Sequence, residues 1–190
     1  NTDVNFGFTA SLFGNEFTPN QTPSLGTGTG WGTRGYWAPI NNENSFLHLG
    51  LSYVDLDVSN ENDQDTARLR VRPDADLSGV RLIDTGNMTF SDSNAVFGVE
   101  GAYVYGPFKA QSEYMSSTVS RTHGFQDWSG DSWYMYGLWN ITGETWSYKN
   151  GVVATPLPNN PGLGMWQVGV RYDAADLNDG SVDYTNPLAP

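Results

Sequence analysis

Apolar and polar positions alternate along most of this chain, which is the pattern of β-strands whose two faces meet different surroundings. In the segment SFLHLGLSYVDLDV, Leu47, Leu49 and Leu51 fall on one face, whereas His48 and Gly50 fall on the other. Helical periodicity is nearly absent, and 22 glycines and ten prolines divide the sequence into short lengths. The pattern predicts an all-β protein.

The alternation predicts about eight strands, at residues 5–13, 31–40, 45–58, 66–73, 95–105, 108–119, 132–142 and 164–174. Short turns such as Gly106-Pro107 alternate with longer polar connections. Turns of alternating length are typical of an antiparallel up-and-down β-barrel. We expect one β-barrel domain over residues 1–190, in a mature chain or a piece of a longer one.

The alternation alone does not say which face is covered. In a soluble β-sandwich the apolar face points inward, whereas in a transmembrane β-barrel it points to lipid. Aromatic residues make up 14% of the chain, and several, such as Tyr53, Trp133 and Tyr172, fall near the ends of predicted strands, where a membrane interface would place them. Gly101 and Gly137 interrupt the apolar faces, which lipid tolerates better than a tight core does. We therefore favour the transmembrane barrel.

The composition of the chain argues against several classes of function. Nine Lys and Arg stand against 21 Asp and Glu, so the net charge of −12 argues against nucleic acid as a partner. The absence of cysteine excludes disulfides and thiolate metal sites within these residues. No apolar run approaches the roughly 18 residues that a spanning helix needs.

One basic cluster interrupts this acidic chain at TARLRVRP, residues 66–73. On a strand, Arg68, Arg70 and Arg72 would lie about 6.6 Å apart on one face. Guanidinium groups match the oxygens of phosphate and carboxylate, and closely spaced sites let an anion pass from one to the next. The row predicts an anion path; an ordinary solvated face, with the arginines paired to nearby carboxylates, is the alternative. Arg34, Lys109 and Arg171 also fall on the predicted polar faces.

Four motifs occur in order from about Arg34 onward: RLRVRP, FGVEGAYVYGPFKAQSEYM, WNITGETWSYK and WQVGVRYDAADLNDG. Together they resemble the phosphate-selective porins of the O and P type, a family of Gram-negative outer membranes. The resemblance implies a barrel of about sixteen strands, of which this chain would supply about half. It also implies a homotrimer, contact with outer-membrane lipid and lipopolysaccharide, and an arginine ladder down the lumen. Arg68, Arg70 and Arg72 match the ladder strand, and Arg171 matches the arginine of the Arg-Tyr motif.

The function expected from these observations is passive diffusion of small anions such as phosphate through an arginine-lined pore of the bacterial outer membrane, without catalysis, cofactor or metal. The expected solute-binding residues are Arg68, Arg70, Arg72, Arg34, Lys109 and Arg171. The alternative is a soluble β-sandwich that binds carbohydrate or acts as a glycosidase, with Glu100 and Glu113 as the acidic pair.

Overall fold

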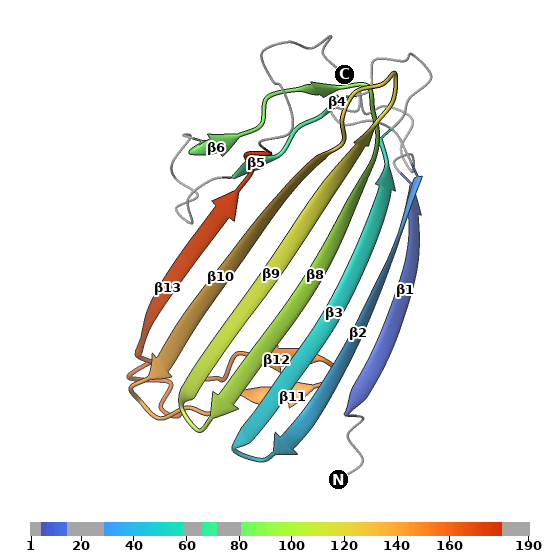
Figure 1. Cartoon of the computed structure of the whole chain (residues 1–190). Coiled ribbons are helices and arrows are strands. Elements are labelled where there is room, and N and C mark those ends of the chain that lie inside the picture. Colours follow the sequence, from blue (N-terminus) through green and yellow to red (C-terminus); the bar gives the residue numbers. More distant parts are fainter. Residues whose placement is uncertain (1–4, 15–28, 59–65, 72–80, 180–190) are drawn as a thin grey trace.

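The computed structural model describes residues 5–14, 29–58, 66–71 and 81–179. Its main element is one seven-stranded antiparallel sheet in the order β1-β2-β3-β8-β9-β10-β13. The strands are β1 (Phe6–Gly14), β2 (Thr29–Asn42), β3 (Ser45–Asp57), β8 (Ser91–Tyr105), β9 (Phe108–Arg121), β10 (Trp128–Asn140) and β13 (Gln167–Asp176). Neighbours in the sheet are also neighbours along the chain apart from the short elements inserted between them, so the path is up and down (Figure 1).

The all-β, antiparallel prediction is confirmed, and seven of the predicted strands match the seven strands of this sheet. Closure into a barrel is not seen within the described residues, because β1 and β13 form the two open edges of the sheet.

The predicted strand at residues 66–73 is wrong. Thr66–Ala67 forms β4, which pairs with β7 (Met88–Thr89), and Arg70–Val71 forms β5, which pairs with β6 (Ile83–Asp84). These short pairs belong to the connection between β3 and β8 and lie outside the main sheet (Figure 1). Arg72 lies outside the described residues. A continuous arginine row on a wall strand is therefore not what residues 66–71 form.

A hairpin that the alternation did not predict joins β10 to β13. It consists of β11 (Ser147–Lys149) and β12 (Val152–Ala154), which pair antiparallel. The turn is Asn150-Gly151, with φ angles of 51° and 79°. Positive φ at both central residues is the requirement of a tight type I′ hairpin turn, and Asn-Gly is its preferred sequence.

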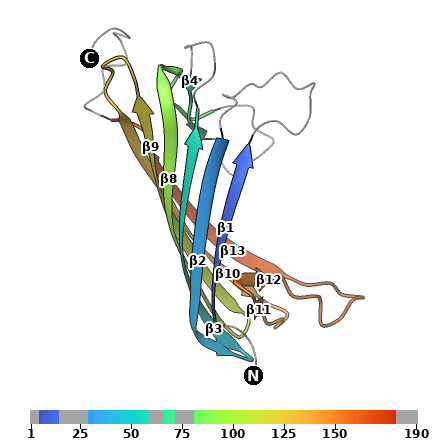
Figure 2. The ribbon, with the colours of Figure 1, turned by 90° about the vertical axis from the view of Figure 1, so that its right-hand side faces the viewer.

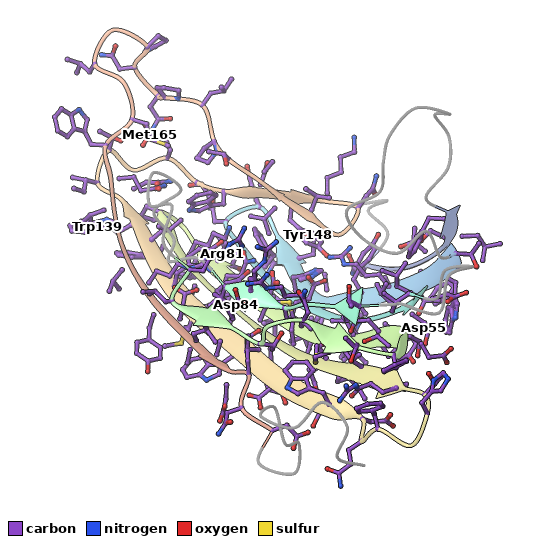
Figure 3. All side chains as sticks on the ribbon, turned by 90° about the horizontal axis from the view of Figure 1, so that it is seen from above. Asp55, Arg81, Asp84, Trp139, Tyr148 and Met165 are labelled. Carbon is purple, nitrogen blue, oxygen red and sulfur yellow. The ribbon has the colours of Figure 1, made fainter. Side chains whose placement is uncertain are left out.

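The sheet is curved, and the hairpin crosses its concave side (Figures 2 and 3). Polar residues such as Arg34, Glu100 and Gln111 face this concave side, whereas large apolar residues such as Leu51 and Val170 point outward, as Trp139 does in Figure 3. The outward side chains stay exposed: Val170 is 76% exposed, Trp37 56% and Leu51 55%. Nothing in the described part of the chain covers this convex face.

Two small clusters hold the short elements against the concave face. Near one end of the strands, Met88 of β7 and Ala67 of β4 pack with Val119 and Trp128. Near the other end, Trp146 packs with Phe46 and Val104, with Tyr148 and Val153 of the hairpin beside them. The core of this protein thus lies inside the curve of the sheet.

Candidate functional site on the concave face

Three of the predicted cations lie on wall strands and face the concave side: Arg34 on β2, Lys109 on β9 and Arg171 on β13. The alternation predicted this placement correctly. Arg68 lies between β4 and β5, and Arg70 lies in β5, next to Val71, which lines the same cavity as Arg171. The structure brings Arg34 and Lys109 into one cavity and keeps Arg68 away from it.

Arg68 is held by Asp84. Its Nε and Nη2 donate to the two carboxylate oxygens of Asp84, at 2.7 and 2.5 Å. Hydrogen bonds from Arg68 and from the Gly86 N–H, with the nearby charge of Arg70, lower the pKa of Asp84 to about 2. This value lies below the ordinary aspartate pKa. The Arg68–Asp84 pair therefore contributes its full stabilisation to the fold above about pH 4, and this stabilisation is lost as the pH falls towards 2. Arg68 therefore ties β6 to the segment between β4 and β5.

Arg34 forms an ion pair with Glu100 across the sheet. The Arg34 Nε donates to Oε1 of Glu100 at 2.8 Å, and Nη2 lies 2.5 Å from the same oxygen. Glu100 reaches Arg34 over Gly50 of the intervening strand β3, where any Cβ would collide with the Glu100 side chain. A glycine at this position is thus what allows the two charges to meet.

His48 completes this group and connects it to the hairpin. The imidazole is only 4% exposed. Its Nε2 lies 3.1 Å from Oε1 of Glu100 and 3.5 Å from Nη2 of Arg34, and its Nδ1 lies 2.7 Å from the hydroxyl of Tyr148. Arg34 also donates to the carbonyl of Gly151 at 3.4 Å. Burial raises the pKa of Tyr148 to about 12, so this residue offers an uncharged hydroxyl.

Lys109 is enclosed by aromatic rings. Its Nζ lies 5.2 Å from the ring centroid of Tyr136 and 4.8 Å from that of Trp146, within the range of cation–π attraction. A cavity of about 380 Å³ lies between Lys109 and the group of Arg34, His48 and Glu100. Gly151, in the turn of the hairpin, also lines it. We call this cavity, with Arg34, His48, Glu100, Lys109 and Gln111, the wall–hairpin site.

Arg171 belongs to a second cavity, of about 620 Å³, which is lined by Val71, Leu82, Met115 and Tyr134 among others. Its guanidinium carbon lies 4.0 Å from the ring centroid of Tyr134, and the group is paired with Asp173 on the same strand at 2.7 Å. Arg171 is therefore a cation on the concave side whose charge is offset by a neighbouring carboxylate.

The Ile-Thr-Gly-Glu motif has a structural task that the sequence did not reveal. Glu144, only 2% exposed, accepts hydrogen bonds from the Thr142 hydroxyl and from the N–H of Asn159. These hydrogen bonds lower the pKa of Glu144 below its usual range. The Trp166 N–H donates to the Thr142 hydroxyl at 3.1 Å. The motif thus fixes both ends of the long connection that carries the hairpin.

The sequence placed His48 and Glu100 on the polar faces but did not predict their contacts with Arg34, and it did not identify Trp146 or Tyr148. The Asn150-Gly151 pair between Tyr148 and Val153 was the available signal for the hairpin. In the described ranges, no three His, Asp or Glu side chains converge in the manner of a metal site. Nor does any described segment form a helix that is long and apolar enough to cross a membrane.

An antiparallel sheet with an exposed apolar face and a polar, ion-paired concave face has the construction of a membrane porin wall. The chain belongs to the family of phosphate-selective porins O and P, since the profile of that family matches residues 2–187.

Two relatives extend this result. Porin O of Pseudomonas aeruginosa is 30% identical over 165 residues, which cover 78% of this chain and 38% of that protein. An uncharacterized protein of Caulobacter vibrioides is 31% identical over 140 residues, which cover 72% of this chain and 28% of that protein. The chain thus spans well under half the length of either relative.

Proposed function

We propose that this chain forms part of the wall of a bacterial outer-membrane porin through which small anions such as phosphate diffuse passively, without catalysis. The observation that carries the proposal is the convex face. Several strands carry large, exposed apolar side chains on this face, including Leu51, Met135 and Val170. A soluble protein rarely exposes so large an apolar surface, whereas lipid is the surrounding that it fits.

In this proposal the concave face lines the lumen. Arg34, Lys109 and Arg171 lie on it, on three different strands, and Arg70 lies next to Val71, which lines the same cavity as Arg171. Cations spaced along a wet wall attract anions without holding them tightly. Because Glu100 and Asp173 offset Arg34 and Arg171, we expect a modest preference for anions.

The remaining parts of the proposal concern the assembly. The open edges at β1 and β13 would pair with further strands of a longer protein, which would close the barrel. The convex face would contact outer-membrane lipid and lipopolysaccharide, or a second copy of the chain within a homotrimer. The name of the family supports phosphate as the solute.

The alternative of a soluble β-sandwich requires a second layer over the apolar face. The short elements of the described residues pack instead on the polar side, through the clusters around Trp128 and Trp146. Glu100 is engaged by Arg34 and His48, so Glu100 and Glu113 are not the free acid and base pair that a glycosidase needs. We therefore do not propose a glycosidase or a carbohydrate-binding module.

The proposal predicts channels with a measurable anion preference. The complete protein, reconstituted in planar bilayers, should show a reversal potential of anion-selective sign under a potassium chloride gradient, and phosphate should reduce the chloride current. Replacing Arg68, Arg70 and Arg72 with alanine should lower the anion-to-cation permeability ratio by about two- to fivefold, because each removed charge acts on ions several ångströms away in water.

The matched control is the triple lysine variant, which keeps the charge and should retain most of the preference. Absence of channels would contradict the porin itself. An unchanged reversal potential in the triple alanine variant would contradict the role of the arginines and leave the porin standing.

A further inference from the structure

The wall–hairpin site contains one histidine, His48. Histidine is the side chain that ordinarily gains a proton between about pH 8 and pH 5. His48 is buried among charged and hydroxyl groups from several strands, and no role for it follows from the arginine path. Its surroundings decide what protonation would do.

Both ring nitrogens of His48 already face atoms that can accept a hydrogen bond. Nε2 lies 3.1 Å from a carboxylate oxygen of Glu100, and Nδ1 lies 2.7 Å from the Tyr148 hydroxyl oxygen. In the neutral form one of these nitrogens donates and the other accepts, and the Tyr148 hydroxyl can donate in turn. In the imidazolium form both nitrogens donate to the same two partners. The charged ring is therefore accommodated without moving the hairpin.

The charges that face His48 come from each element around it. Strand β2 contributes Arg34 and the ring of Tyr36, which stacks at 6.0 Å; β8 contributes Glu100; and β11 contributes Tyr148. Lys109 of β9 lines the same cavity. Glu100 pairs with Arg34, and Glu113 of β9 lies opposite Glu100 in the sheet register and accepts a hydrogen bond from Gln111. A proton on His48 therefore adds one positive charge to a group of two cations and two carboxylates.

From this arrangement we infer that His48 makes the wall–hairpin site a proton-controlled anion site, which favours small anions more strongly as the pH falls. The inference rests on the proposed porin function. With His48 neutral, the charges of Arg34, Lys109, Glu100 and the adjacent Glu113 sum to zero; with His48 protonated, the sum is one positive charge. The hairpin stays docked in both states, so the lumen width is unchanged and only its charge changes.

The chain offers a matched control for this inference. It has two histidines, and the second, His123, lies exposed in the connection between β9 and β10, away from the cavity. Its Nδ1 contacts the Thr122 hydroxyl at 2.9 Å, and its ring lies beside Phe90. A His123→Gln variant therefore changes a histidine without touching the site.

The test is the reversal potential of the complete protein in planar bilayers under a potassium chloride gradient, at pH 8 and at pH 5.5. Chloride does not titrate in this interval, and ordinary carboxylates stay ionised. The anion-to-cation permeability ratio of the wild type should rise about two- to fivefold on acidification, the effect of one unit charge within several ångströms of a passing ion. Low ionic strength is needed because salt screens this effect.

The His48→Gln variant should lose most of this rise, and the His123→Gln variant should keep it. A His48→Arg variant, whose guanidinium stays charged at both pH values, should show at pH 8 the higher ratio that the wild type reaches at pH 5.5. An equal rise in wild type and His48→Gln would overturn the inference. If His48→Gln does not fold, a His48→Arg ratio at pH 8 no higher than that of the wild type would overturn it equally. Wild-type protein that forms no channels would instead remove the porin function.

Discussion

Replacing Trp146 with alanine should lower the free energy of unfolding by about 3–5 kcal/mol, the usual cost of truncating a buried tryptophan. Trp146 is only 5% exposed, packs against Phe46 and Val104 of the wall, and covers the ammonium group of Lys109. Its loss should also free the hairpin from the wall and raise single-channel conductance. Urea unfolding of the complete protein in lipid vesicles measures the first effect, and bilayer recordings measure the second.

Trp146→Phe is the matched control. The indole Nε1 of Trp146 is buried without a hydrogen-bond partner in the described structure, so phenylalanine removes no hydrogen bond and also removes an unsatisfied donor. Its cost should stay below about 1.5 kcal/mol, as for other apolar replacements of similar shape. Equal costs for alanine and phenylalanine would mean that the packing of the hairpin against the wall is not what Trp146 contributes.

An arginine in place of Leu51 should destabilise the membrane-inserted protein by about 2–4 kcal/mol, the cost of a cation on the lipid face of a barrel near the middle of the bilayer. Leu51 stands near the centre of β3 and points to the convex face, where it is 55% exposed. Unfolding by urea in vesicles measures this cost.

The neighbouring position provides the comparison. Ser52 of the same strand points to the concave face, where its hydroxyl lies close to Gly98. In the porin account an arginine there extends into water, so Ser52→Arg should cost much less than Leu51→Arg. The opposite order would show that the convex face is the one that meets water.

The alternation of apolar and polar residues was enough to predict the seven strands of the main sheet and to divide their residues between two faces. This worked because a strand of more than ten residues repeats its pattern several times, as in β3 and β8. The correct placement of Arg34, Lys109 and Arg171 on one side follows from the same regularity.

The segment at residues 66–73 shows where that reasoning fails. Its alternation is as clear as that of the wall strands, but β4 and β5 each have only two residues, and their partners β6 and β7 are equally short. Asp84 forms an ion pair with the guanidinium of Arg68, and Leu69 packs against the cluster around Trp128. Local periodicity does not encode which distant segment a strand pairs with, so these contacts could not be predicted.

The contacts of the predicted cations Arg34 and Lys109 could not be predicted from the sequence for a related reason. Glu100 meets Arg34 over an intervening strand, and Trp146 reaches Lys109 from a hairpin that folds back over the sheet. Both contacts depend on register and on the path of a connection. The sequence signal that was available, Asn150-Gly151, predicts a turn but not the surface on which the hairpin lies.

The most direct test of the account asks which face of the sheet meets water in the membrane. These 190 residues contain no cysteine, so single cysteines can be placed on β10 at Ser132, which faces the concave side, and at Met135, which faces the convex side. In outer-membrane vesicles that contain the complete protein, a charged, water-soluble maleimide should label Ser132→Cys, whereas Met135→Cys should react only after denaturation. Rapid labelling of Met135→Cys with protection of Ser132→Cys would contradict the porin account.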